Sequence, residues 1–130
     1  MSDEQPIMWL SCHVGTDVTQ ISVAGEVDLS NAHLLTELVE SAVAAPAPLV
    51  VIDLAEVSFF GAYGTNALVL AQRVLTGHGR RLVLHRPSQV VRRVLGVTGT
   101  LTAFEVVDRP ALPAAADGWA RPVLPTRSGS

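Results

Sequence analysis

Apolar and polar residues follow two different periods in the first half of the chain. Two short apolar segments, Ile7–His13 and Val18–Ala24, flank a glycine-containing turn, which is typical of a β-hairpin. From Asn31 to Ala44, leucines and valines recur every three or four residues, and this spacing predicts an amphipathic helix. Ser30 precedes this segment and is expected to cap the helix.

The second half alternates predicted strands with predicted helices. Leu49–Leu54 is a continuous apolar run with a β-branched centre, as in a strand covered on both faces. A loop over Ala55–Tyr63 then leads into a helix over Gly64–His78. The remaining predicted elements are a strand at Arg81–His85, a short helix that opens at Arg86–Ser88 and ends at Gly96, and a strand near Ala103–Val107. The order ββαβαβαβ predicts an α/β sandwich with a mostly parallel central sheet, an N-terminal hairpin and helices packed on the sheet.

Length and composition favour one folded domain followed by a tail. The 130 residues have room for one core, and a chain that is 48% hydrophobic and 16% charged can bury enough apolar surface to fold. Prolines recur after Arg109, so we expect one folded domain over residues 1–108 and a Pro/Ala-rich tail over residues 109–130. At most two helical turns are expected at Ala111–Gly118, and the tail is expected to be dispensable for folding.

Neither a membrane span nor a secretory signal is predicted. The longest uncharged stretch, Val57–Gln72, is interrupted by serine, glycine, threonine and asparagine, and the first residues of the chain are acidic rather than basic. We therefore expect a cytoplasmic protein that does not insert into membranes.

The residue types exclude several kinds of chemistry. The chain has one cysteine, Cys12, and no lysine, so it has no intramolecular disulfide, no thiol pair for zinc or redox chemistry and no P-loop lysine. Its four histidines lie in different predicted elements, which argues against a metal site. No nucleophile and base, and no pair of carboxylates, converge on one predicted loop. We therefore expect no catalytic residue and no cofactor.

Charge is distributed unevenly along the sequence. Residues 1–56 contain nine acidic residues and no arginine, whereas residues 57–104 contain six arginines and no acidic residue. One interpretation is that the two segments pack together and neutralise each other. The alternative is a basic face that meets an acidic partner, formed by Arg80, Arg81, Arg86, Arg92 and Arg93. Direct binding to nucleic acid is not expected, because no aromatic residues interleave with these arginines.

Four motifs stand in a specific order between residues 7 and 107. They are Gly25–Asp28 after the second predicted strand, Leu49–Phe59, the glycine-bearing loop into the second predicted helix, and Pro87–Gly96. Their order and spacing resemble the STAS domain family (sulfate transporter and anti-sigma factor antagonist). The resemblance implies that the chain binds an anti-sigma factor of the kinase type and so frees its sigma factor, as bacterial single-domain members of the family do.

The sequence departs from this family in the loop that carries its phosphorylation switch. In such proteins the loop typically reads Phe-x-Asp-Ser-Ser/Thr-Gly, and the anti-sigma kinase phosphorylates the hydroxyl residue before the glycine, which breaks the complex. Aligned on Phe59 and Gly64, this chain has Gly61, Ala62 and Tyr63 at the Asp, Ser and Ser/Thr positions. Tyr63 therefore stands at the phosphoacceptor position without a short hydroxyl, and we expect no Ser/Thr switch.

The resemblance also implies a partner-binding surface around this loop. Its expected residues are Asp28, Ser30, Gly61, Ala62, Tyr63, Gly64, Thr65 and Asn66. Thr65 is the hydroxyl nearest to the acceptor position and is the alternative phosphorylation site. Tyr63 is either an exposed interface anchor or a ring folded over Phe59 or Phe60.

Functions of different kinds stay open at this point. The favoured one is an anti-sigma factor antagonist-like binding module, not an enzyme, that regulates sigma-dependent transcription. The alternative is a STAS subunit of an ABC-type membrane transport assembly, which would bind an ATPase or permease subunit. A small-molecule sensor would need a pocket that the sequence does not reveal.

Overall fold

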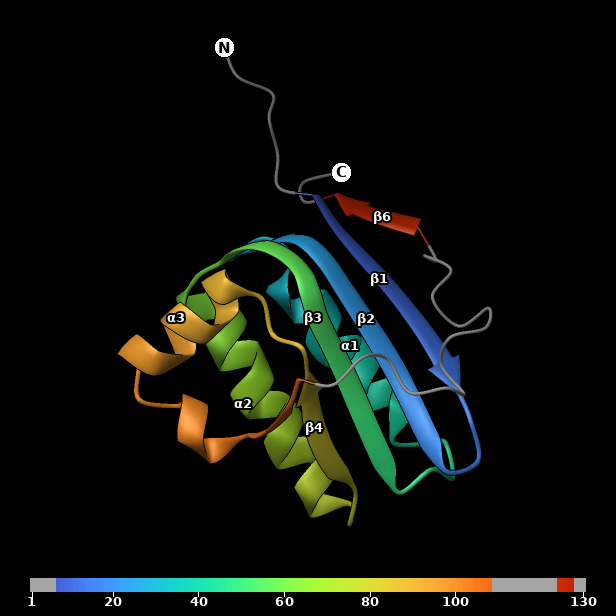
Figure 1. Cartoon of the computed structure of the whole chain (residues 1–130). Helices are drawn as coiled ribbons and strands as arrows, with labels where there is room; N and C mark the ends of the chain where they lie inside the picture. Colours follow the sequence, from blue (N-terminus) through green and yellow to red (C-terminus); the bar gives the residue numbers. More distant parts are fainter. Residues whose placement is uncertain (1–6, 109–123, 128–130) are drawn as a thin grey trace.

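The computed structural model describes residues 7–108 and the backbone of residues 124–127. The elements in chain order are β1 (Ile7–Val14), β2 (Val18–Val27), α1 (Ala32–Ala42), β3 (Leu49–Phe60), α2 (Ala62–Gly77), β4 (Arg81–His85), α3 (Gln89–Val97), a 3-10 turn (Leu101–Ala103), β5 (Glu105–Val107) and β6 (Leu124–Arg127) (Figure 1). None of the helices in these ranges is long and apolar enough to cross a membrane.

The strands form a single sheet in the order β5-β4-β3-β2-β1-β6. Strands β2, β3, β4 and β5 run parallel to one another, and β1 runs antiparallel to both β2 and β6. The β1–β2 hairpin and the parallel β2–β5 sheet confirm the predicted α/β architecture. The strand near Ala103–Val107 is shorter than predicted, because residues 101–103 form the 3-10 turn.

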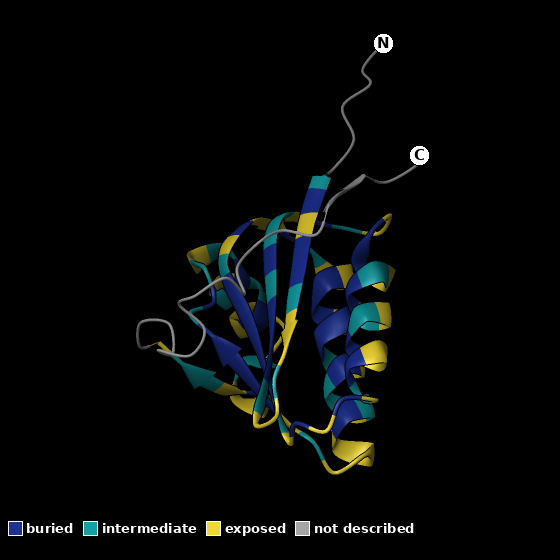
Figure 2. Cartoon of the chain, turned by 90° about the vertical axis from the view of Figure 1, so that its right-hand side faces the viewer, coloured by how far each residue is buried: buried dark blue, intermediate teal, exposed yellow. Residues whose placement is uncertain are grey.

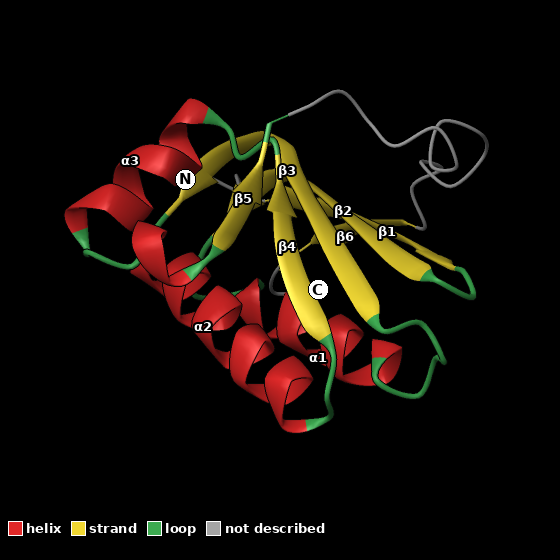
Figure 3. Ribbon diagram, turned by 60° about the horizontal axis from the view of Figure 1, so that its bottom comes forward, coloured by secondary structure: helices red, strands yellow, loops and turns green. Residues whose placement is uncertain are grey.

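The hydrophobic core lies between the sheet and the helices. Helices α1 and α2 lie side by side under one face of the sheet, and α3 packs beside α2 and against β3 (Figure 3). In β3, Val50, Ile52 and Leu54 are fully buried in this core, as are Leu68 and Leu75 of α2. The buried sides of the helices face the sheet and the exposed sides face outward (Figure 2). Each such side chain contributes about 1.5–3 kcal/mol through burial.

The junction between β3 and α2 differs from the prediction. A loop was predicted over Ala55–Tyr63, whereas β3 continues to Phe60 and α2 begins at Ala62. The reason is that β2 also continues to Val27 and pairs with the extended β3 through two register shifts. Only Gly61 lies between the strand and the helix, so the backbone turns sharply at this point.

Strand β6 was not predicted, because proline usually interrupts a strand. Its register places Pro125 opposite Trp9 of β1, at the outer edge of the sheet. An edge strand tolerates proline because one side of its backbone needs no partner. Part of the segment predicted to be a tail therefore belongs to the sheet. The helical turns predicted at residues 111–118 lie outside the described residues.

Candidate functional site

The predicted binding residues lie where two strand-to-helix junctions meet at one end of the molecule. The β2–α1 junction contains Asp28 and Ser30, and the β3–α2 junction contains Gly61. The backbone N–H of Gly61 donates a hydrogen bond to the carbonyl of Val27 at 3.5 Å, which joins the two junctions. The structure thus brings together two groups of predicted residues that are more than 30 positions apart in the chain.

Hydrogen bonds within the β2–α1 junction hold its backbone in one conformation. Asp28 Oδ1 accepts hydrogen bonds from the Ser30 backbone N–H at 2.9 Å and from Ser30 Oγ at 2.6 Å. The fully buried Asn31 side chain accepts from the Asp28 N–H at 3.0 Å and donates to the Glu26 carbonyl at 2.9 Å. This turn leaves Leu29 64% exposed. Such local side-chain bonds order a turn before any partner binds.

The predicted capping role of Ser30 is therefore wrong. Asn31 is the N-cap residue of α1, and it forms no side-chain capping bond to the helix. The Ser30 hydroxyl does not reach the helix because it is already bonded to the Asp28 carboxylate.

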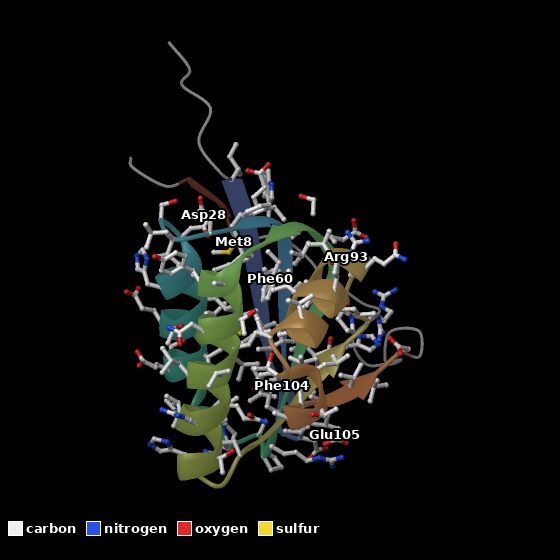
Figure 4. All side chains as sticks on the ribbon, turned by 90° about the vertical axis from the view of Figure 1, so that its left-hand side faces the viewer. Met8, Asp28, Phe60, Arg93, Phe104 and Glu105 are labelled. Atoms are coloured by element: carbon white, nitrogen blue, oxygen red, sulfur yellow. The ribbon has the colours of Figure 1, made fainter. Side chains whose placement is uncertain are left out.

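Gly64 is required by packing against Phe60. A Cβ atom at this position would lie 2.6 Å from Cε1 of the Phe60 ring, closer than real Cβ contacts come. Phe60 is only 2% exposed and lies between α2 and the strands (Figure 4). The glycine thus allows the first turn of α2 to sit directly on the core. This requirement is steric and does not depend on a bound phosphate.

Two of the predicted binding residues point away from the surface. Gly64 is buried, and Thr65 is only 7% exposed, with its Oγ1 atom enclosed and without a hydrogen-bond partner within residues 7–108. Because a kinase must reach the hydroxyl that it modifies, Thr65 is a poor substitute for the missing acceptor. Neither residue is placed to contact a partner. Both were predicted because the sequence alone does not separate the residues of this loop that face the core from those that face outward.

The exposed residues of the two junctions form a continuous candidate surface. Tyr63 and Phe59 are each 52% exposed, and the Phe59 ring lies over Gly61, 3.7 Å from an ideal Cβ there. Of the two alternatives for Tyr63, the exposed ring is the one observed. We define the junction surface by the exposed and half-exposed residues at this end, which are Asp28, Leu29, Ser30, Phe59, Gly61, Ala62, Tyr63 and Asn66.

An open groove of about 350 Å³ extends from the junction surface between α1 and α2. Its walls are Leu29, Ala32, His33, Thr36, Glu37 and Glu40 on the α1 side and Tyr63, Asn66 and Leu70 on the α2 side. Sequence analysis missed Leu29, Leu70 and the groove itself. The spacing of Tyr63, Asn66 and Leu70 places them on one helical face, but only the packing of α1 against α2 shows that this face borders a groove.

Two other reactive side chains, those of Asp53 and Cys12, are buried or half-buried within the fold. Asp53, within the central strand β3, accepts hydrogen bonds from Arg86 at 3.0 Å and from the Ala55 N–H at 2.9 Å, and His85 Nδ1 lies 3.5 Å from it. Burial raises the pKa of the half-buried Cys12 thiol, so the thiol is protonated and weakly nucleophilic at neutral pH. No group of three potential metal ligands occurs within the described ranges.

Together, the fold and the junction surface define a small α/β domain with one helix-covered sheet and an exposed strand-to-helix junction. The family model described as "Mlab, STAS domain" matches residues 14–106. The chain therefore belongs to the STAS domain family, as its motifs indicated.

Solved structures agree with this assignment. An anti-sigma factor antagonist from Mycobacterium paratuberculosis is 27% identical, with a TM-score of 0.69 over 83% of this chain and 90% of that one. Unphosphorylated SpoIIAA of Bacillus, an anti-sigma factor antagonist, is 19% identical, with a TM-score of 0.65 over 77% of this chain and 89% of its own.

A third structure, an anti-sigma factor antagonist (STAS) domain protein from Planctomyces limnophilus, is 20% identical, with a TM-score of 0.60 over 78% of this chain and 91% of its own. At their low identity, this structure and SpoIIAA establish the fold alone. The search of curated proteins found no match.

Proposed function

We propose that this STAS domain is an anti-sigma factor antagonist that binds an anti-sigma factor through the junction surface. The observation that supports this most directly is the 27% identity to the Mycobacterium paratuberculosis antagonist across nearly the whole of both domains. The exposed Tyr63, Phe59 and Leu29 supply large apolar side chains of the kind that anchor protein interfaces. The protein acts in the bacterial cytoplasm by binding and not by catalysis, and it regulates transcription by freeing a sigma factor.

We further propose that phosphorylation on serine or threonine does not control this binding. A phosphate would add nearly two negative charges to the start of α2 and would disrupt a complex formed there. Ala62 has no hydroxyl, Tyr63 presents a phenol, and the Thr65 hydroxyl is enclosed. Binding is then constitutive or is controlled through a different partner or ligand at the same loop.

The decisive experiment combines the purified full chain with the kinase-type anti-sigma factors encoded in the same genome. Affinity is measured by calorimetry, and release of the sigma factor is measured by transcription in vitro. The Tyr63→Ser variant should bind about 2 kcal/mol more weakly, roughly 30-fold, because the ring is truncated at the centre of the surface. Val97→Ala is the matched control, since Val97 is an apolar residue that is 83% exposed on α3. Equal losses in the two variants would exclude the junction surface.

A capture experiment with the immobilised full chain separates the proposal from its alternative. Recovery of an anti-sigma factor supports the proposal. Recovery of an ATPase or permease subunit would instead assign the chain to a membrane transport assembly.

The phosphorylation proposal has its own test. The wild-type chain incubated with its anti-sigma kinase and ATP should not gain the mass of a phosphate. The triple variant Gly61→Asp, Ala62→Ser and Tyr63→Ser restores the family loop and should be phosphorylated at position 63. Phosphate on Thr65 of the wild-type chain would mean that the hydroxyl becomes exposed and that the switch is retained in a shifted form.

A further inference from the structure

The α1 wall of the groove carries two acidic side chains, with His33 one helical turn before Glu37. Glu37 and Glu40 are exposed there, and neither forms an ion pair with any described residue. Arg73 stands one turn beyond Leu70 on α2, but it does not line the groove and has no ion pair with the described part of the chain. Negative charge at this end of the groove is therefore available to a basic group from outside.

The rest of the groove contains exposed apolar side chains as well as His33, Thr36 and Asn66, and its apolar residues have the spacing of a helix surface. Leu29, Tyr63 and Leu70 are 64%, 52% and 38% exposed, respectively. Tyr63 and Leu70 are two turns apart on α2, about 10 Å, and the α1 wall from Ala32 to Glu40 is about 12 Å long. These lengths match two turns of a third helix laid along the groove.

We propose that the groove between α1 and α2 binds a basic amphipathic helix of a partner protein. Apolar residues on one face of this helix would contact Leu29, Tyr63 and Leu70, and its arginine or lysine residues would pair with Glu37 and Glu40. The inference rests on the proposed function in one respect, because the groove shares Leu29, Tyr63 and Asn66 with the junction surface. It adds the chemistry and the secondary structure of the partner segment.

Charge also argues against a second copy of this chain as the occupant. A symmetric dimer through this face would place the same surface patch on both subunits. Such an interface would bring Glu37 and Glu40 of both copies into one contact region without adding a basic residue from the groove lining, and an excess of one charge is unfavourable in an interface. A basic partner removes this repulsion and pairs the charges.

The probe is a fluorescein-labelled helical peptide of about 14 residues, long enough for the groove with flanking turns. It carries leucines at helical positions i, i+4 and i+7 and arginines beside them. A second peptide has glutamate in place of each arginine, and a third has the arginine peptide's composition in scrambled order. Binding to the full chain is measured by fluorescence anisotropy, and the site is mapped by chemical-shift changes.

The variant is the double substitution Glu37→Arg and Glu40→Arg, both at exposed positions. It should weaken binding of the arginine peptide by at least about tenfold and strengthen binding of the glutamate peptide. The control is the double substitution Asp17→Arg and Glu56→Arg, which changes the net charge equally at exposed positions outside the groove. Its affinity for the arginine peptide should stay within about twofold of the wild type, because distant charges are screened.

Three outcomes would overturn the proposal. They are equal binding of the scrambled peptide, equal weakening by the control variant, and chemical-shift changes that avoid residues 29–40 and 63–70.

Failure of this proposal is distinguishable from failure of the proposed function. An anti-sigma factor that binds the Glu37→Arg and Glu40→Arg variant as tightly as the wild type would refute the proposal that a basic helix binds in the groove. It would leave the proposed antagonist function intact. A peptide that binds in the groove while no anti-sigma factor is bound would refute the antagonist function alone.

Discussion

The two sides of the molecule use their charged residues differently. On the α1 side, Asp28 bonds only within its own turn and Glu37 and Glu40 border the open groove. On the α3 side, most arginines are engaged within the protein, although Arg93 points outward on the side of the molecule opposite Asp28 (Figure 4). Charges that are free for a partner are thus mainly acidic, whereas most of the arginines in this region form contacts within the fold.

The partners of the arginines show how this difference arises. Arg81 pairs with Glu105, Arg92 with Asp108 and Arg86 with Asp53, while Arg80 donates to the carbonyls of Val43 and Ala45 at the end of α1. Of these ion pairs, only that of Arg86 joins the acidic first segment of the sequence to the arginine-rich segment. The expected neutralisation of one segment by the other is therefore largely wrong, and the alternative basic face is reduced by these internal contacts.

The prediction with the largest expected effect asks whether Asp53, which pairs with Arg86, stabilises the fold. Arg86 has a left-handed backbone, with φ of 49°, which costs about 1–3 kcal/mol and must be held by its contacts. Asp53→Ala removes the carboxylate that binds Arg86 and the Ala55 N–H, so unfolding free energy should fall by about 3 kcal/mol. Urea denaturation measures this change.

Glu40→Ala is the control on the opposite side. Glu40 is exposed and has no ion pair with a described residue, so its loss should change stability by less than about 0.5 kcal/mol. Similar losses in the two variants would remove the distinction between free and structural acids.

A second substitution tests the packing of the first turn of α2 on Phe60, beneath the junction surface. Gly64→Ala places a methyl group against the enclosed Phe60 ring, and overpacking of this kind should cost about 2 kcal/mol. Gly77→Ala, at the last residue of α2, meets nothing within 4 Å and should be neutral or slightly stabilising. Thermal denaturation compares the two. Unchanged stability of Gly64→Ala would mean that Phe60 can move, and that the glycine has a role other than packing.

The sequence predicted the sheet, the hairpin and the helices because their apolar periods are regular. It did not predict the extended β3, since Ser58 and Phe59 are exposed and only pairing with Gly25–Val27 keeps this segment in the sheet. The junction residues were identified by resemblance, but Gly64 and Thr65 could not be separated from the exposed ones. Leu29 and Leu70 were missed because a groove depends on how two helices pack, which no local pattern records.

Removal of β6 should have a smaller effect. Truncation after Asp108 deletes a four-residue edge strand that pairs with β1, so we expect a loss of about 1 kcal/mol and a melting midpoint lower by a few degrees. The remaining domain should still fold, as the sequence predicted for residues 1–108, and circular dichroism on heating measures both points. An unfolded truncated chain would show that residues after 108 are essential to the core.

The smallest effect concerns the Arg81–Glu105 pair between β4 and β5. Arg81 Nε donates to Glu105 Oε1 at 2.8 Å, and this hydrogen bonding holds the pKa of Glu105 below its usual range. A carboxylate whose pKa is lower in the folded state contributes stability above its unfolded pKa and loses it as pH falls through the folded value. Glu105→Gln should therefore be slightly less stable than the wild type at neutral pH, and the two curves should converge in acid.

Both residues of this pair are exposed, so solvent and salt weaken their interaction, and the difference should shrink further at high ionic strength. Arg81→Gln should lose the same small amount, and the double variant should lose no more than either single one, because all three remove one interaction. Additive losses would mean that the two residues act separately. The arginine-rich side would then depend on Asp53 and on backbone contacts, and not on its surface ion pairs.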